Sequence, residues 1–302
     1  MTRRLNWILL ALLLLAGLPY YWLLLDNRPG DARPRPVTIE QLRQLAGSIP
    51  GEAPSAVEME LAASSRLPGN LFVAGSGMKR KLIGIMAWRL PVKGGKAVMI
   101  DSGISPDGAQ DMKVEEFHPK TQARIERALD QAGLILVTHE HPDHIGGLVH
   151  WAGQSALGKA RLNGPQSLAV GKLVGMTVQD ASPVANGPPY AVAPGVVVIP
   201  AASHTPGSQM IFVRLASGRE FLFTGDIATF TQSWAETRAR SQLLSRYLVP
   251  EDRDAVFAWL LTIKALKASA PGLVILPGHD TELLFEPKNH TGVRHGFTLP
   301  RV

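Results

Sequence analysis

The chain begins with a long, uninterrupted run of apolar residues. Trp7 to Leu25 is a stretch of 19 residues that contains ten leucines and no charged side chain. As an α-helix it would measure about 28 Å, close to the hydrocarbon thickness of a bilayer. Aromatic residues lie near both ends, as in interfacial belts. This pattern predicts an uncleaved signal anchor, because a cleaved signal peptide has a shorter apolar core and a buried core helix has a polar face.

Positive charges flank this run almost evenly. Arg3 and Arg4 precede it, and Arg28, Arg33 and Arg35 follow it closely, so the positive-inside rule is nearly balanced. The very short N-terminal tail and the large body behind the run favour a body outside the cytoplasm. We therefore expect a single-pass membrane protein whose folded domain is periplasmic or otherwise extracytoplasmic.

The rest of the chain divides into a connection and a large body. Residues 27–36 mix Pro, Arg, Asp and Gly, a composition typical of a linker. Thr38 and Gln41 then have the spacing of a capping box, ahead of a short helix that ends near Ala46. The predicted organisation is a transmembrane anchor over residues 1–26, a linker with a short helix over 27–54, and one domain over 55–302.

Apolar runs recur through the body with two different periods. Short alternating or β-rich runs between Gly-rich turns predict strands. These runs cover residues 57–62, 71–73, 82–90, 97–100, 134–137, 196–199, 210–215, 220–223 and 273–276. Helical spacing predicts helices over residues 121–132 and 254–268. A capping-box pattern at Ser233 and Glu236 predicts a third helix, capped by Ser233 and running towards Tyr247. Strands that come first and then alternate with helices predict an α/β fold.

Composition excludes several classes of chemistry. Hydrophobic residues make up 45% and charged residues 19% of the chain, which excludes disorder and allows a large core. The chain has no cysteine, so disulfides, thiolate metal sites, a thiol nucleophile and an acylated lipoprotein anchor are all excluded. The net charge is +6, but no dense Lys/Arg run accompanies it, so nucleic-acid binding is not expected. Protein partners are left open.

A dense group of candidate metal ligands follows the predicted strand 134–137. His139 and His141 stand two positions apart, so an extended segment turns both imidazoles the same way, towards one cation. A proline then turns the chain, which lets Asp143 and His144 reach a second position. The two glycines that follow permit a close approach into the next helix.

Three more candidate ligands stand just beyond other predicted strands. His204 lies in Ser-His-Thr-Pro-Gly, Asp226 in Thr-Gly-Asp, and His279 in Pro-Gly-His-Asp. Each is a weak signal alone, because a loop histidine more often lies on the surface or only makes hydrogen bonds. With the first group they offer five His and two Asp, enough for two metals with open positions. Imidazole and carboxylate without thiolate favour two Zn²⁺, with iron or manganese as alternatives.

These motifs resemble those of the metallo-β-lactamase-fold hydrolase superfamily, in the same order, over roughly residues 55–285. The resemblance implies a four-layer αββα sandwich, in which two sheets lie face to face, helices lie outside and the metals sit at one edge. Carried over by position, it places His139, His141 and His204 at the first metal, Asp143, His144 and His279 at the second, and Asp226 between them. Asp101 matches an early aspartate of the family, which supports the ligand loop.

Such a site implies a binuclear metal-dependent hydrolase. Two metals lower the pKa of a shared water towards about 7 and hold hydroxide as the nucleophile. Asp143 is the predicted catalytic residue, because it is placed both to bind metal and to move a proton. Asp226 makes the chain similar to the lactonase and glyoxalase-II-like branches, which implies a small-molecule substrate with an ester-type bond, a lactone or a thioester. β-Lactam or phosphodiester hydrolysis and a mononuclear-iron persulfide oxygenase are the alternatives.

The segment from Thr229 to Pro250 looks like the helix-bearing insert of the lactonase-type hydrolases. It contains Trp234, Arg238, Arg240 and Tyr247. Two hypotheses compete for these side chains: they line a substrate pocket, or they form a packed aromatic and a solvated helix face. The helical pattern favours the second hypothesis.

Overall fold

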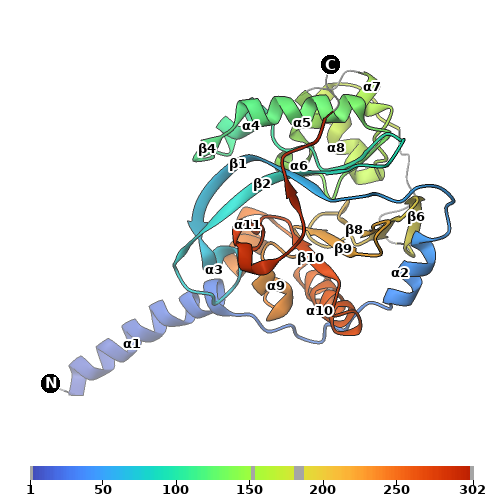
Figure 1. Ribbon diagram of the computed structural model, residues 1–302. Helices are drawn as coiled ribbons and strands as arrows, with labels where there is room; N and C mark the ends of the chain where they lie inside the picture. Colours follow the sequence, from blue (N-terminus) through green and yellow to red (C-terminus); the bar gives the residue numbers. More distant parts are fainter. Residues whose placement is uncertain (1–2, 151–153, 180–186, 300–302) are drawn as a thin grey trace.

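Two β-sheets stack at the centre of the computed structural model, which describes residues 3–150, 154–179 and 187–299 (Figure 1). The strands of the first sheet are β1 (Glu58–Pro68), β2 (Arg80–Leu90), β3 (Val98–Ile100), β4 (Glu116–Phe117), β5 (Leu134–Leu136) and β11 (Arg294–His295). Their order is β11-β1-β2-β3-β5, and β4 also pairs with β1. The strands of the second sheet are β6 (Tyr190–Ala193), β7 (Val196–Pro200), β8 (Gln209–Arg214), β9 (Glu220–Gly225) and β10 (Val274–Pro277), in the order β10-β9-β8-β7-β6.

Helices cover the outer face of each sheet. On the first sheet lie α5 (Pro119–Gln131), α6 (Pro142–His150) and α8 (Gly164–Val174), and on the second lie α2 (Ile39–Ala46) and α10 (Arg253–Ser269). Shorter elements complete the body: α3 (Gly69–Phe72), α4 (Pro106–Asp111), α7 (Gln154–Leu157), α9 (Thr231–Ala235), α11 (Thr281–Phe285), the π-helix η2 (Leu244–Leu248) and the 3₁₀-helix η3 (Pro287–Asn289). The order helix, sheet, sheet, helix is the four-layer αββα sandwich that the resemblance implied.

Alternation along the strands builds three cores, one between each pair of layers. Val196 and Val198 of β7 point between the sheets, whereas Val197 and Ile199 point towards α2 and α10. Between the sheets the ring centroids of Trp88 and Phe223 are 5.2 Å apart in an edge-on arrangement. Strands covered on both faces read as continuous apolar runs, which is why the sequence pattern located them.

One predicted strand is wrong. Leu71 and Phe72 lie in α3, and only Val73 of the run 71–73 is extended. Three residues are too few to show a period, so periodicity cannot separate a strand from a single helical turn. The other predicted strands are present with boundaries that differ by one to six residues.

The predicted helix from Ser233 towards Tyr247 is interrupted. Thr237 has a left-handed φ of 54°, and the chain runs without helical structure until shortly before η2. Ser233 is the third residue of α9 and not its cap, since its hydroxyl accepts a hydrogen bond from the Phe230 amide at 3.3 Å. This break turns Arg240 inward, as described below.

The apolar N-terminal run forms a helix that projects from the body (Figure 1). It comprises α1 (Arg3–Tyr20) and the π-helix η1 (Tyr21–Leu25), and none of its apolar stretch is buried inside the protein. Within the described residues it is the one helix long and apolar enough to cross a membrane, and a signal sequence also has this length and composition. The residues after it follow the surface of the body, where the Arg35 amide donates to Thr262 Oγ1 at 2.7 Å.

Candidate metal centre

Parallel strand pairs bring the candidate residues to one edge of the sandwich. β3 runs parallel to β5, and β9 runs parallel to β10, so the carboxyl ends within each pair coincide. Asp101 follows β3, and its carboxylate accepts a hydrogen bond of 2.7 Å from the Thr138 amide just after β5. The predicted supporting role of Asp101 is therefore visible in its contacts. Asp101 also has a left-handed φ of 56°, a strained backbone held by this network.

The loop after β5 presents its imidazoles before α6 begins at Pro142. The carbonyl oxygen of His141 accepts hydrogen bonds from the amides of His144 and Ile145, which closes the first turn of the helix. Gly147 makes this geometry possible, because a Cβ there would overlap the carbonyl oxygen of Ser102. The expected close approach of the two glycines is thus present.

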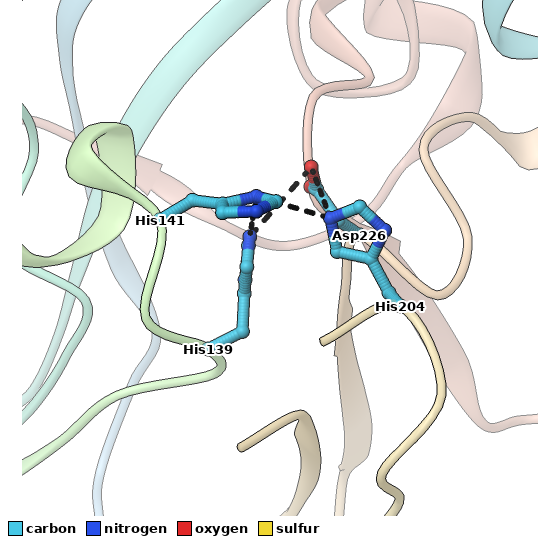
Figure 2. A group of neighbouring side chains, drawn as sticks. All are labelled: His139, His141, His204 and Asp226. Atoms are coloured by element: carbon cyan, nitrogen blue, oxygen red, sulfur yellow. Dashed lines mark hydrogen bonds and ion pairs between the residues drawn. The ribbon is translucent and has the colours of Figure 1, made fainter. Parts of the chain in front are cut away.

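The first group of candidate ligands consists of His139, His141, His204 and Asp226, which converge from three loops (Figure 2). Nδ1 of His141 lies 3.1 Å from Nε2 of His139 and 3.1 Å from Nε2 of His204. Within this group one ligand atom from each residue lies within 4.8 Å of every other. Three ring nitrogens and a carboxylate oxygen therefore face a common point.

The second group consists of Asp143, His144 and His279, and Asp226 lies between the two groups. Oδ1 of Asp226 is 2.9 Å from Nε2 of His279 and 3.6 Å from Nε2 of His144. Its Oδ2 lies 3.7 Å from Nε2 of His204. Oδ2 also lies 3.1 Å from Nε2 of His279, so the carboxylate as a whole lies between the two groups, as a bridging ligand requires. All seven residues predicted from the sequence come together in this arrangement.

Hydrogen bonds on the far side of the rings direct the other nitrogens into the site. Nδ1 of His279 donates to the Gly84 carbonyl at 2.7 Å, and Nδ1 of His144 lies 2.9 Å from Asp101 Oδ2. In both rings Nε2 is left facing Asp226. Such outer contacts set the tautomer and orientation of metal-ligating histidines.

Burial keeps the first three imidazoles neutral. It lowers the pKa of His139 and of His204 well below the ordinary value and also lowers the pKa of His141. Burial alone would raise the pKa of Asp226, but His279 and Arg240 hold it well below its ordinary value. In the first group these are the protonation states that a metal ion requires. In the second group burial would lower the pKa of both imidazoles, but nearby carboxylates raise the pKa of His279 and raise the pKa of His144 to about 10, so a metal ion that binds there would release protons.

The donor set fits a pair of metal ions. Nε2 of His144 and Oδ1 of Asp226 are buried and make no hydrogen bond within the described residues. Buried polar atoms that make no hydrogen bond are rare in proteins, and an ion between His144 and Asp226 would satisfy both atoms. Five imidazoles and two carboxylates suit Zn²⁺ and also other divalent transition metals.

Two further residues belong to this site, of which the sequence analysis named Arg240 only under the hypothesis it disfavoured and did not name Glu251. Arg240 is buried, its Nη2 donates to Asp226 Oδ2 at 2.6 Å, and it lines the pocket, so the preference for a solvated helix face is wrong for this residue. Glu251 is buried, and its Oε2 lies 2.8 Å from Nδ1 of His204. Of the other insert residues, Tyr247 is exposed and Trp234 packs at the edge of a core. No local motif marks either missed residue, because their partners are distant in sequence.

A pocket of about 400 Å³ opens directly on both groups. His141, Asp143, Asp226 and His279 form its floor, together with Arg240. Its walls are largely apolar and include Leu67, Phe72, Ile83, Met112, Leu244 and Val249. Among the described lining residues Arg240 is the one cationic side chain other than histidine, and it is already paired with Asp226.

Comparisons with known proteins agree with this geometry. The sequence profile of the metallo-β-lactamase superfamily matches residues 89–279, more than half of the chain and a range that includes all seven candidate ligands. No curated protein sequence matches the chain.

Several solved structures share the fold at low sequence identity. A quorum-quenching N-acyl homoserine lactone lactonase is 16% identical, with a TM-score of 0.59 over 76% of this chain and 94% of its own. An N-acyl homoserine lactone hydrolase with N-hexanoyl-L-homoserine bound at its catalytic metal center is 15% identical, with a TM-score of 0.60 over 77% of this chain and 96% of its own. AidC, a dizinc quorum-quenching lactonase, is 13% identical, with a TM-score of 0.53 over 76% of this chain and 89% of its own. The fold, the paired His/Asp groups and the profile match together establish that this chain belongs to the metallo-β-lactamase superfamily and has its hydrolase fold.

Proposed function

We propose that the protein is a dizinc hydrolase that opens lactones carrying an apolar acyl chain. The observation that carries this proposal is the largely apolar pocket that ends on both ligand groups. An acyl chain would lie against Phe72, Leu244 and Val249 while the ester reaches Asp143 and Asp226. Each methylene removed from water contributes about 0.8 kcal/mol to binding. A thioester of the same acyl chain would fit the same walls.

Each zinc ion would be held by its own set of candidate ligands. His139, His141 and His204 would hold one zinc ion, Asp143, His144 and His279 the other, and Asp226 both. When bound, the two ions supply an activated water near neutral pH and polarise the ester carbonyl.

Hydrolysis itself needs one proton transfer. The oxygen of water adds to the carbonyl carbon, the ring C–O bond breaks, and the departing alkoxide takes a proton. Asp143 would carry this proton from the attacking water to the alkoxide, because its carboxylate lies at the pocket floor. Arg240 would hold Asp226 in place through its hydrogen bond to Oδ2. The pocket offers no second cation to a phosphodiester among the residues described, which favours a neutral ester over that alternative.

We also infer that the N-terminal helix is retained as a membrane anchor, with the body outside the cytoplasm. Asp26, directly after η1, is buried, and the Asn27 side chain accepts a hydrogen bond of 3.1 Å from the Ala239 amide. Residues that directly follow the apolar run therefore belong to the folded body, which supports an uncleaved helix. The division into residues 1–26, 27–54 and 55–302 remains our expectation for the domains.

The test is metal analysis of the purified full-length protein, followed by a substrate panel. We expect two zinc ions per chain and hydrolysis of N-decanoyl homoserine lactone in preference to a decanoyl thioester, a β-lactam and a phosphodiester. His204→Ala or Asp226→Ala should abolish turnover while the protein stays folded. His295→Ala is the matched control, since His295 is an exposed histidine on β11.

Three results would count against the proposal. Full activity of either site variant as metal-free protein would exclude the assigned centre. Bound iron with oxygen consumption would instead support a persulfide oxygenase. If the protein binds zinc but hydrolyses no substrate of the panel, the metal has only a stabilising role.

A further inference from the structure

The apolar helix is fixed to the body and is not a flexible tether. The Gly75 amide donates to the Leu24 carbonyl at 3.0 Å, and Arg253 Nη2 donates to the Asp26 carbonyl at 2.6 Å. The side chain of Asn27 donates to the Thr237 carbonyl at 3.3 Å. These bonds join η1 and the next two residues to the body beside α3 (Figure 1). A helix held in this way sets how the body is oriented above a membrane.

Interfacial side chains gather where the helix meets the body. The ring of Trp22 in η1 lies 6.4 Å from the ring of Tyr247, edge on, and the guanidinium of Arg246 lies 5.7 Å from the Trp22 ring centroid. Trp and Tyr are the residues enriched at the boundary between headgroups and acyl chains. Because Tyr247 contacts Trp22 near the end of the apolar helix, a helix that spans a bilayer would place Tyr247 at the depth of that boundary.

The same segment carries exposed apolar surface. Tyr247 and Leu248 of η2 each expose 61% of their surface. Met78 exposes 58%, in the loop after α3 whose Gly75 binds the helix. Lys79 and Arg246 beside them are exposed and would face lipid phosphates.

This apolar patch borders the pocket. Leu244 and Val249 flank the exposed pair in sequence, and both line the pocket. Phe72 of α3 lines it from the neighbouring element, and η1 contacts α3. The pocket wall and the patch are therefore two sides of the same short segments.

We propose that Tyr247 and Leu248 insert into the phospholipid bilayer as a second membrane contact, which holds the pocket against the membrane surface. The fixed helix brings this pair to the interface, and the adjacent cations match anionic headgroups. One consequence concerns the substrate and rests on the proposed function. An acyl lactone dissolved in the bilayer can enter the pocket between η2 and α3 without first leaving the lipid phase.

The absence of cysteine makes a direct test simple. A nitroxide is attached at Leu248→Cys or Tyr247→Cys in the full-length protein, which is then placed in phospholipid nanodiscs. Leu168→Cys is the matched control, because Leu168 is also 61% exposed but lies on α8, far from the helix (Figure 1). Electron paramagnetic resonance then measures how far each label is accessible to oxygen, which concentrates in lipid, and to a water-soluble nickel chelate.

We expect the labels at positions 247 and 248 to gain oxygen accessibility and lose nickel accessibility relative to position 168. Equal accessibility at the three positions would overturn the proposal. Spin–spin coupling between labels on two chains would also overturn it, because a second copy of the chain would then cover the patch. A purified protein that lacks the N-terminal helix would overturn it as well. Circular dichroism shows that each variant is folded, and neither bound metal nor turnover is needed, so a failure of the proposed function would not affect the result.

Discussion

His204 illustrates how single side chains are held in this site. Its Nδ1 lies 2.8 Å from Oε2 of Glu251, and both side chains are fully buried. Burial raises the pKa of Glu251 to about 7, although the charges of Arg240 and Arg253 act in the opposite direction. A proton shared between Nδ1 and this carboxyl leaves Nε2 of His204 free to face the other ligands. The tautomer of a candidate ligand is thus set by a residue that does not itself reach the metal position.

Glu251→Gln should weaken metal binding at the first group. The amide keeps the shape but removes the acid that orients His204, and loss of such outer contacts typically lowers metal affinity by about 10- to 100-fold. Zinc titration against a competing chelator measures the change. Glu220→Gln is the control, since Glu220 is a buried glutamate that pairs with Arg43 at the opposite end of β9. Equal zinc affinity of both variants would contradict the orienting role.

At the scale of elements, the segment between β9 and α10 forms one side of the pocket. α9 ends at Ala235, and the chain that follows brings Arg240 within hydrogen-bond distance of Asp226. η2 then places Leu244 in the pocket wall. Arg240 comes from the non-helical stretch between α9 and η2, and Leu244 is the first residue of η2. This one segment therefore supplies both a polar group of the pocket floor and part of its apolar wall.

Val249→Phe should shorten the acyl chain that the pocket accepts. The larger side chain occupies space next to η2, so kcat/KM for a decanoyl lactone should fall about 10- to 100-fold relative to a butanoyl lactone, the range typical of apolar pockets. Val92→Phe is the control, because Val92 is also half-buried but lies outside the pocket. A parallel loss for both substrates would show a general defect and not a change in chain-length preference.

At the scale of the whole molecule, the metal centre joins the two halves of the sandwich. Its ligands follow β5 of the first sheet and β7, β9 and β10 of the second. Ions bound at these candidate ligands would contact both sheets at one edge, so they would stabilise the relative position of the sheets as well as the reacting groups.

Removal of the metals should lower the melting temperature of the protein. An ion at 100 times its dissociation constant stabilises the folded state by about 2.7 kcal/mol, which corresponds to roughly 5–10 °C for a domain of this size. Differential scanning fluorimetry with and without a chelator measures the shift, and added zinc should reverse it. The Asp226→Ala protein should show a smaller shift. An unchanged melting temperature of the parent protein would contradict binding at this edge.

Local patterns in the sequence were sufficient for most elements and most candidate ligands, whereas the four-layer arrangement was implied by the resemblance to the superfamily. Apolar runs marked eight of the eleven strands in the described residues, because a strand buried on both faces must be apolar throughout. They missed the short strands β4, β6 and β11, which are exposed or half-buried. His139, His141, Asp143 and His144 lie within six residues, so their proximity follows from chain connectivity alone. The remaining three candidate ligands could be placed because each follows a strand, and strand ends meet at one edge.

Only the tertiary structure decided the partners that depend on contacts between distant segments. Glu251 meets His204 across 47 positions of the sequence, and Arg253 reaches the end of the apolar helix across 227. Arg240 meets Asp226 from a non-helical stretch that includes Thr237, whose left-handed φ no periodic pattern encodes. The amino-acid sequence by itself determined the layers, the membrane-length helix and the donor chemistry. Packing decided which carboxylate orients which imidazole and where the helix meets the pocket, because those contacts form only after the layers have assembled.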